Sequence, residues 1–129
     1  MALVYSPQVL DHFERPRNSG VLDEPDASVR LENPACGDVL QLTAKFAGEV
    51  ISDIRFRAKG CVPAIACGSA ITDLARGMNL TDAAAITREQ LLMHLGSLPK
   101  ASAHASHLAI DALALLLKNY TRKRVPLGQ

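Results

Sequence analysis

The sequence predicts an α+β fold in which a small antiparallel sheet of about three strands packs against several helices. Three observations support this class: a short stretch near the N-terminus has helical spacing, a central stretch alternates apolar and polar residues, and the second half carries helix start and stop signals. The 129 residues, 48% of them hydrophobic, suffice for one domain over 1–129 with a buried core.

The first helix is predicted from Ser6 and Pro7, because a serine hydroxyl caps a helix start and proline is tolerated at the first helical position. Its apolar face is formed by Val9, Leu10 and Phe13. Pro16 ends the helix, and the turn-forming residues of 15–26 predict a loop.

From Val39 onward the pattern changes to the period of two that is typical of a half-buried strand. The apolar face of this strand is formed by Leu40, Leu42, Ala44 and Phe46. A turn at 47–49 leads to a β-branched and aromatic stretch at 51–57, which we expect to pair with the first strand as a hairpin. Helices must then cover one face of the sheet.

A helix is predicted from about Pro63 to Gly77, since proline fits a first helical turn and glycine fits a C-terminal cap. Gly68 weakens this helix by up to about 1 kcal/mol relative to alanine, although small residues in such a helix more often permit close packing.

The rest of the chain predicts three more helices. A short one starts at 81–84, and Thr87 with Gln90 matches a capping box that starts the next. A long final helix is predicted from about Ser102 to Tyr120.

The composition argues against several kinds of partner. Lys and Arg total 14 against 13 for Asp and Glu, and a net charge of +1 does not favour a nucleic-acid-binding face. With 4% aromatic residues and no Trp, a base-stacking platform is also unfavourable. The one basic cluster, 122–124, is expected to be a solvated tail rather than an interaction arm.

We expect a cytoplasmic protein with reduced thiols and no membrane contact. The N-terminal residues lack the pattern of a signal peptide, and the longest apolar run, 112–117, is far shorter than the roughly 20 residues of a membrane span. Three cysteines could not form a fully paired disulfide framework, so they need another explanation.

Four residues could bind a metal ion or part of a cluster. Cys36 and Asp38 precede the first predicted strand, Cys61 lies at a helix start, and His104 lies in the first turn of the final helix. The helix dipole is expected to lower the pKa of Cys61. Two thiolates, an imidazole and a carboxylate would satisfy a tetrahedral ion or part of an iron–sulfur cluster. Spacing alone leaves open the alternative that the cysteines are small buried hydrophobic residues.

Several short motifs occur together in a recognisable order and spacing. They are Tyr5-Ser6, Asp11-His12, Pro16-Arg17-Asn18, Pro34-Ala35-Cys36-Gly37-Asp38, Gly60-Cys61 followed by Ala64-Ile65-Ala66, and His104 with Leu108-Ala109 and Asp111-Ala112. Over roughly residues 5 to 120 the chain resembles the U-type iron–sulfur cluster assembly scaffolds, the family of IscU, SufU and the N-terminal domain of NifU. Without an insertion between the Cys61 helix and the last helix, it is more similar to IscU and NifU than to SufU.

The resemblance implies an IscU/NifU-like fold and a scaffold or carrier, not an enzyme. Such a scaffold receives sulfur from a cysteine desulfurase, builds a [2Fe-2S] cluster on three cysteines and passes it to acceptor apo-proteins. It assigns Cys36, Asp38, Cys61 and His104 to the site, but the family's third cysteine is replaced by Ala105. We expect such a chain to be a monomer or weak homodimer.

Two further departures from the family bear on function. The segment 98–102 lacks the second proline and the final lysine of the family's chaperone signature, which puts handoff through the dedicated chaperone in doubt. Cys67 lies six residues after Cys61, less than two helical turns if the helix begins near Pro63. We expect Cys67 to bind the cluster as the missing third thiolate, with packing in the core as the alternative.

The remaining candidates are expected to have lesser roles. Asp11 and His12 are predicted to cap contacts and aid docking rather than bind metal, and His94 to be a surface or packing residue. His107 is not expected to ligate, while Asp111 could orient an imidazole of the final helix.

Two other functions stay open at this point. In one, a degenerate homologue binds a single zinc ion through Cys36, Asp38, Cys61 and His104 and acts as a regulatory or desulfurase-binding module. In the other, Cys61 is a nucleophile with His104 as its base, but no motif supplies an oxyanion site.

Overall fold

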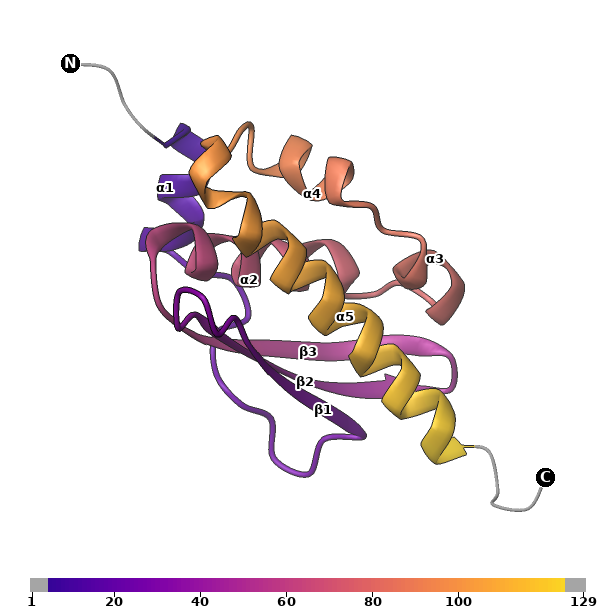
Figure 1. The fold of residues 1–129 in the computed structure, drawn as a ribbon. Helices are drawn as coiled ribbons and strands as arrows, with labels where there is room; N and C mark the ends of the chain where they lie inside the picture. Colours follow the sequence, from indigo (N-terminus) through magenta and orange to yellow (C-terminus); the bar gives the residue numbers. More distant parts are fainter. Residues whose placement is uncertain (1–4, 125–129) are drawn as a thin grey trace.

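In the computed structural model, which describes residues 5–124, a three-stranded sheet is covered on one face by helices (Figure 1). Helix α2 packs on β3 and helix α5 crosses β1 and β2, while α1 and α4 lie against α2. The elements in chain order are α1 Pro7–Glu14, β1 Ala27–Glu32, β2 Val39–Ala47, β3 Val50–Lys59, α2 Val62–Ala75, α3 Leu80–Ala84, α4 Arg88–His94, the 3-10 turn η1 Lys100–Ser102 and α5 Ala103–Arg124. The predicted α+β class is confirmed.

Local sequence signals account for the helix starts. The Ser6 hydroxyl accepts a hydrogen bond from the Val9 amide at 3.0 Å, with Pro7 at the first position of α1, as predicted. The capping box of α4 is also present: the Thr87 hydroxyl accepts from the Gln90 amide, and the Gln90 side chain accepts from the Thr87 amide.

The sheet has the strand order β1-β2-β3 and is antiparallel throughout. The hairpin of β2 and β3 lies where the alternating pattern predicts it, with the two-residue turn Gly48-Glu49. The sequence predicts about three strands but gives positions only for the two strands of the hairpin, so β1 is a finding of the structure. Its residues pair with β2 from Ala27 opposite Ala44 to Glu32 opposite Val39.

Helix α2 contacts β3 on one side and helices α1, α4 and α5 on others, and most of its residues are buried. Gly68 faces the sheet: a Cβ added there would come within 2.7 Å of a ring carbon of Phe56 and 3.1 Å of a methyl group of Leu40. The glycine therefore permits helix–sheet contact, which outweighs its poor helix propensity.

This close approach predicts the effect of a single methyl group. Gly68→Ala is expected to lower the free energy of unfolding by about 1–2 kcal/mol. The added methyl group overpacks the core at a cost of about 1–3 kcal/mol, which is more than the gain of up to about 1 kcal/mol from the better helix propensity of alanine. Urea unfolding measures the change. The control is Ser97→Ala at an exposed loop position, which should change stability by under about 0.5 kcal/mol. An equal or greater stability for Gly68→Ala would contradict the observed packing.

Helix α5 packs on β1 and β2 and runs to Arg124, four residues past the predicted end at Tyr120. The Tyr120 hydroxyl donates to the Gly48 carbonyl at 2.6 Å, and its ring stacks on Phe46 with centroids 3.6 Å apart. Lys123 donates to the Asp26 carbonyl at 3.3 Å. Arg122 and Lys123 are exposed to solvent as expected, but they lie in α5 and not in a frayed tail.

None of the helices within residues 5–124 is both long and apolar enough to cross a membrane. This agrees with the shortness of the apolar runs in the sequence.

Candidate metal centre

Three segments that are distant in sequence bring the candidate ligands together. Residues 33–38 form a tight turn before β2, in which the Cys36 and Gly37 amides both donate to the Asn33 carbonyl. Cys61 is the N-cap residue of α2, directly after β3, and His104 lies in the first turn of α5. The turn leaves Cys36 exposed, so its thiol is open to solvent.

Asp38 is the centre of this group. One carboxylate oxygen, Oδ2, lies 3.2 Å from His104 Nε2 and accepts the Cys61 thiol at 3.4 Å, while Oδ1 accepts the Cys61 amide at 3.3 Å. Ligand atoms of Cys36, Asp38 and His104 all lie within 4.8 Å of one another. The Asp38 side chain is only 4% exposed, whereas that of His104 is 34% exposed and both thiols reach the surface.

Gly60 makes this arrangement possible. Its φ is +141°, and a Cβ added there would overlap Oδ1 of Asp38 and lie 2.8 Å from its Cγ. Only a glycine therefore fits between the end of β3 and the buried carboxylate. The sequence shows Gly60 in the Gly60-Cys61 motif, but neither composition nor spacing predicts that it makes room for the Asp38 carboxylate.

The apo protein holds Cys61 as a thiol. Burial raises the pKa of Cys61; the Ala64 amide lowers it, but the hydrogen bond to Asp38 and the negative charge of Asp38 raise it further. The expectation that the helix N-terminus lowers the pKa of Cys61 is thus wrong in net effect, because burial and the neighbouring carboxylate outweigh the helix amides.

Asp38 shows the opposite shift. Burial acts to raise its pKa, but hydrogen bonds from Cys36 and Cys61 and the charge of His104 lower it in sum. The carboxylate is therefore ionised at neutral pH, and a metal ion would meet a preformed negative charge beside the protonated thiol of Cys61. Metal binding through Cys61 releases the proton of that thiol, so binding becomes more favourable as pH rises.

This coupling predicts how the apo protein reacts with an alkylating agent. Asp38→Asn is expected to speed alkylation of Cys61 several-fold at pH 7.5 to 8, because losing the neighbouring charge lowers the pKa of the thiol and the thiolate is the nucleophile. Peptide mapping by mass spectrometry measures the rate at Cys61. The control Asp53→Asn, which removes a carboxylate paired with Arg55 on β3, should leave that rate unchanged. A slower rate in Asp38→Asn would contradict the assigned cause.

Cys67 lies apart from this group. Its side chain is fully buried in the hydrophobic core, and burial, with a smaller contribution from the Cys61 charge, raises its pKa to about 12. The groups of closely placed ligand atoms within residues 5–124 include neither Cys67 nor Cys61, but Cys61 contacts Asp38 directly at 3.4 Å. This geometry is that of a packing cysteine and not of the expected third thiolate, because the thiol faces the core instead of Asp38.

The position of the missing family cysteine is also buried. Ala105 is 1% exposed and packs in the core, whereas its neighbour His104 faces the site. Helix α5 thus contributes an imidazole but no thiol.

A cleft of about 290 Å³ adjoins His104 and is lined in part by His107 and Asp111. No hydrogen bond or ion pair between Asp111 and either imidazole is found within residues 5–124. An orienting role for Asp111 therefore stays a prediction. The cleft gives open access to the imidazole from the side of α5.

The sequence did not reveal a second group of ligating side chains, His12, Asp73 and His94. His12 is buried on α1, where burial lowers its pKa, and His94 contacts Asp73 of α2. Asp11 instead binds Arg17 at 2.5 Å and Arg15 at 2.9 Å, and hydrogen bonds to these two cations lower its pKa. No spacing rule connects residues on three different helices, so this group emerges only from the fold.

The fold and the site together define a class: a small α+β protein in which two thiols and an imidazole each approach one buried carboxylate, Asp38. The chain belongs to the family described as the NifU-like N terminal domain, which matches residues 4–126.

Known relatives agree with this assignment. The iron-sulfur cluster assembly scaffold protein IscU of Haemophilus influenzae is 40% identical over 126 residues, which cover 95% of this chain and 99% of that protein. IscU 1 of Archaeoglobus fulgidus, also described as such a scaffold protein, is 41% identical over 93% of this chain and 78% of its own length. The crystal structure of the N-terminal part of a NifU-like protein from Brucella abortus is 20% identical, with a TM-score of 0.76 over 93% of this chain and 96% of that one, and shows the same fold. The resemblance seen in the sequence is confirmed.

Proposed function

We propose that this protein is an iron–sulfur cluster assembly scaffold or carrier that binds iron or a [2Fe-2S] cluster as its cargo and transfers it to acceptor apo-proteins. The observation that carries the proposal is the convergence of Cys36, Cys61 and His104 on the buried carboxylate of Asp38. Membership in a family whose relatives are named scaffold proteins supports it.

The four groups are sufficient in number for the cargo. A [2Fe-2S] cluster takes four protein ligands, and imidazoles replace two of the thiolates in some natural clusters. Here Cys36 and Cys61 supply thiolates, while His104 and Asp38 supply the other two donors. Ala105 then requires no substitute, and Cys67 remains a core residue.

The same donor set suits a protein that must release its cargo. A carboxylate is a harder ligand than a thiolate and holds iron within a cluster less tightly. Both thiols are solvent-exposed, which lets the thiols of an acceptor approach and exchange with them. Asp38 can also take part in release, because its oxygen accepts the Cys61 thiol when the metal leaves.

The expected partners follow from this cargo. Sulfur is supplied by a cysteine desulfurase, and acceptor apo-proteins with free thiols take the finished cluster. The altered segment 98–102, which includes the turn η1, argues for handoff without the dedicated chaperone. We place this activity in the cytoplasm, without catalytic turnover by the scaffold itself.

Anaerobic reconstitution tests the proposal. Incubation with ferrous iron, cysteine and a cysteine desulfurase should give the visible absorption of a [2Fe-2S] cluster at about one cluster per chain or per pair of chains, and the cluster should move to an apo-ferredoxin. A protein that forms no cluster under these conditions, although it is folded, would contradict the proposal.

A second candidate function uses the same residues. Two thiolates, an imidazole and a carboxylate also complete a tetrahedral zinc site, with the protein acting as a regulatory or desulfurase-binding module. Elemental analysis of protein purified without added metal separates the two functions. Zinc that iron and sulfide never displace would favour the module, whereas its replacement by a cluster favours the scaffold.

A further inference from the structure

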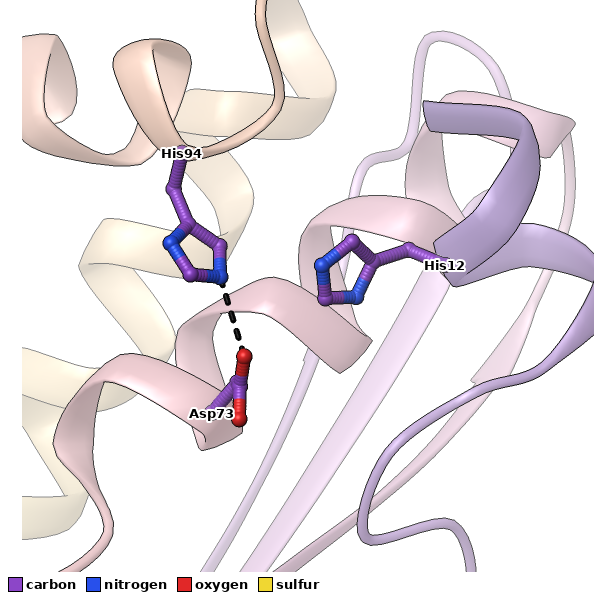
Figure 2. A group of neighbouring side chains, drawn as sticks. All are labelled: His12, Asp73 and His94. Atoms are coloured by element: carbon purple, nitrogen blue, oxygen red, sulfur yellow. Dashed lines mark hydrogen bonds and ion pairs between the residues drawn. The ribbon is translucent and has the colours of Figure 1, made fainter. Parts of the chain in front are cut away.

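A second set of ligating side chains lies between three helices (Figure 2) and shares no residue with the group around Asp38. His12 comes from α1, Asp73 from α2 and His94 from the end of α4. His94 Nε2 lies 3.0 Å from Asp73 Oδ2, and the two imidazole rings have centroids 5.3 Å apart. Donor atoms from all three residues lie within 4.8 Å of one another.

The buried histidine of this set is held in place from behind. His12 Nδ1 lies 2.8 Å from the hydroxyl oxygen of Ser69, which also accepts the Arg17 amide at 2.8 Å. Ser69 is fully buried, so this contact fixes the imidazole ring. Figure 2 shows the other ring nitrogen, Nε2, turned toward His94 and Asp73. In the tautomer whose Nδ1–H donates to Ser69, Nε2 carries the lone pair that binds a metal. Metal-binding histidines commonly donate their second ring N–H in this way.

We propose that His12, Asp73 and His94 form a second metal site, which takes a divalent ion of the zinc class with water as the fourth ligand. Two imidazole nitrogens and one carboxylate oxygen are donors that suit Zn²⁺, Co²⁺ and Ni²⁺.

The distances permit such an ion after small movements. With bonds of 2.0–2.2 Å, donor atoms on a tetrahedral ion lie about 3.4 Å apart. The pair of His94 and Asp73 is already at 3.0 Å, and the widest separation in the group is within 4.8 Å. His94 and Asp73 have side chains that are 31% and 41% exposed, which leaves an entry path and room for the water, whereas His12 is only 5% exposed.

The second site is separate from the cysteine site. Cys61 caps the start of α2, and Asp73 lies twelve positions later, about 18 Å along a helix axis. The second set contains no thiol, so its ion would be held without thiolate donors. An ion there would join α1 to α2 and α4, adding to the hydrogen bond that the Ser6 hydroxyl donates to the Leu95 carbonyl. Such an ion would stabilise the fold without being part of the cargo.

Metal stoichiometry in the full-length chain tests the second site independently of cluster assembly. In a Cys36→Ala/Cys61→Ala background, equilibrium dialysis against Zn²⁺ followed by elemental analysis should give one ion per chain. Adding His94→Ala should abolish that binding, whereas adding the control His107→Ala, an exposed histidine of α5, should leave it at one. Because His94 is partly exposed at the end of α4, its loss should leave the fold intact by circular dichroism; Asp73→Asn, which keeps the side-chain shape, should weaken binding at least tenfold.

Co²⁺ provides a second readout. In the double-cysteine variant, bound Co²⁺ should give weak visible bands without thiolate-to-metal charge transfer, and Zn²⁺ should raise Tm only while His94 is present. Zero ions per chain in the double-cysteine variant, or one ion that survives His94→Ala, would overturn the second site. Neither result would affect the reconstitution of a cluster on the cysteines.

Discussion

Cys61→Ala is expected to abolish cluster formation on this protein. The substitution removes one of two thiolates and leaves three donors where a [2Fe-2S] cluster takes four. It also removes the thiol that contacts Asp38. Since the loss of an outer-shell contact alone can weaken metal binding by about 10–100-fold, loss of a direct ligand should lower the yield at least about tenfold. Visible absorption after anaerobic reconstitution measures it.

His107→Ala serves as the matched control for this experiment. His107 lies on the same helix as His104, beside the site, but outside the group of converging donors. Its variant should reconstitute like the unmodified protein. If Cys61→Ala keeps the full cluster spectrum, the centre does not include the N-cap residue of α2.

Gly60→Ala should disrupt both stability and metal binding. Alanine at a φ of +141° costs about 1–3 kcal/mol of folding free energy. The new methyl group would also displace the Asp38 carboxylate, since its Cγ lies 2.8 Å from the added atom. Urea unfolding measures the first effect, and iron or zinc binding by the folded variant measures the second.

Gly48→Ala separates these two effects. Gly48 has a φ of +64° in the β2–β3 turn, and an added Cβ meets nothing within 4 Å. This variant should lose about 1–2 kcal/mol of stability through its backbone alone and bind metal normally. Equal metal binding by the two variants would contradict the role of Gly60 in seating the carboxylate.

Much of the fold could be predicted because it depends on short-range rules. Ser6 with Pro7 and Thr87 with Gln90 start helices where capping chemistry requires, and alternation predicts the hairpin. Strand β1 was not located, although Ala27 and Val29 point into the core, because six residues of alternation beside a long loop are a weak signal. The extra turn of α5 depends on tertiary contacts that no local pattern contains.

The site was predictable only as a set of residues. The motifs indicated Cys36, Asp38, Cys61 and His104, but not that a buried carboxylate joins the other three or that it raises the pKa of Cys61. Helical spacing left both orientations of Cys67 open, because six residues after Cys61 can place a side chain toward the site or the core depending on where the helix begins. The side chain's full burial follows from packing of α2 against the sheet and α5.

The central claim is that two cysteines, one histidine and one aspartate hold the cluster without help from Cys67. Anaerobic reconstitution of Cys67→Ala tests it most directly, with absorption in the visible range as the measurement. Because Cys67 is a core residue, the variant should lose about 1 kcal/mol of stability but form the same cluster in the same yield. Loss of the cluster in a folded Cys67→Ala protein would show that the third thiol is a ligand and would contradict the account.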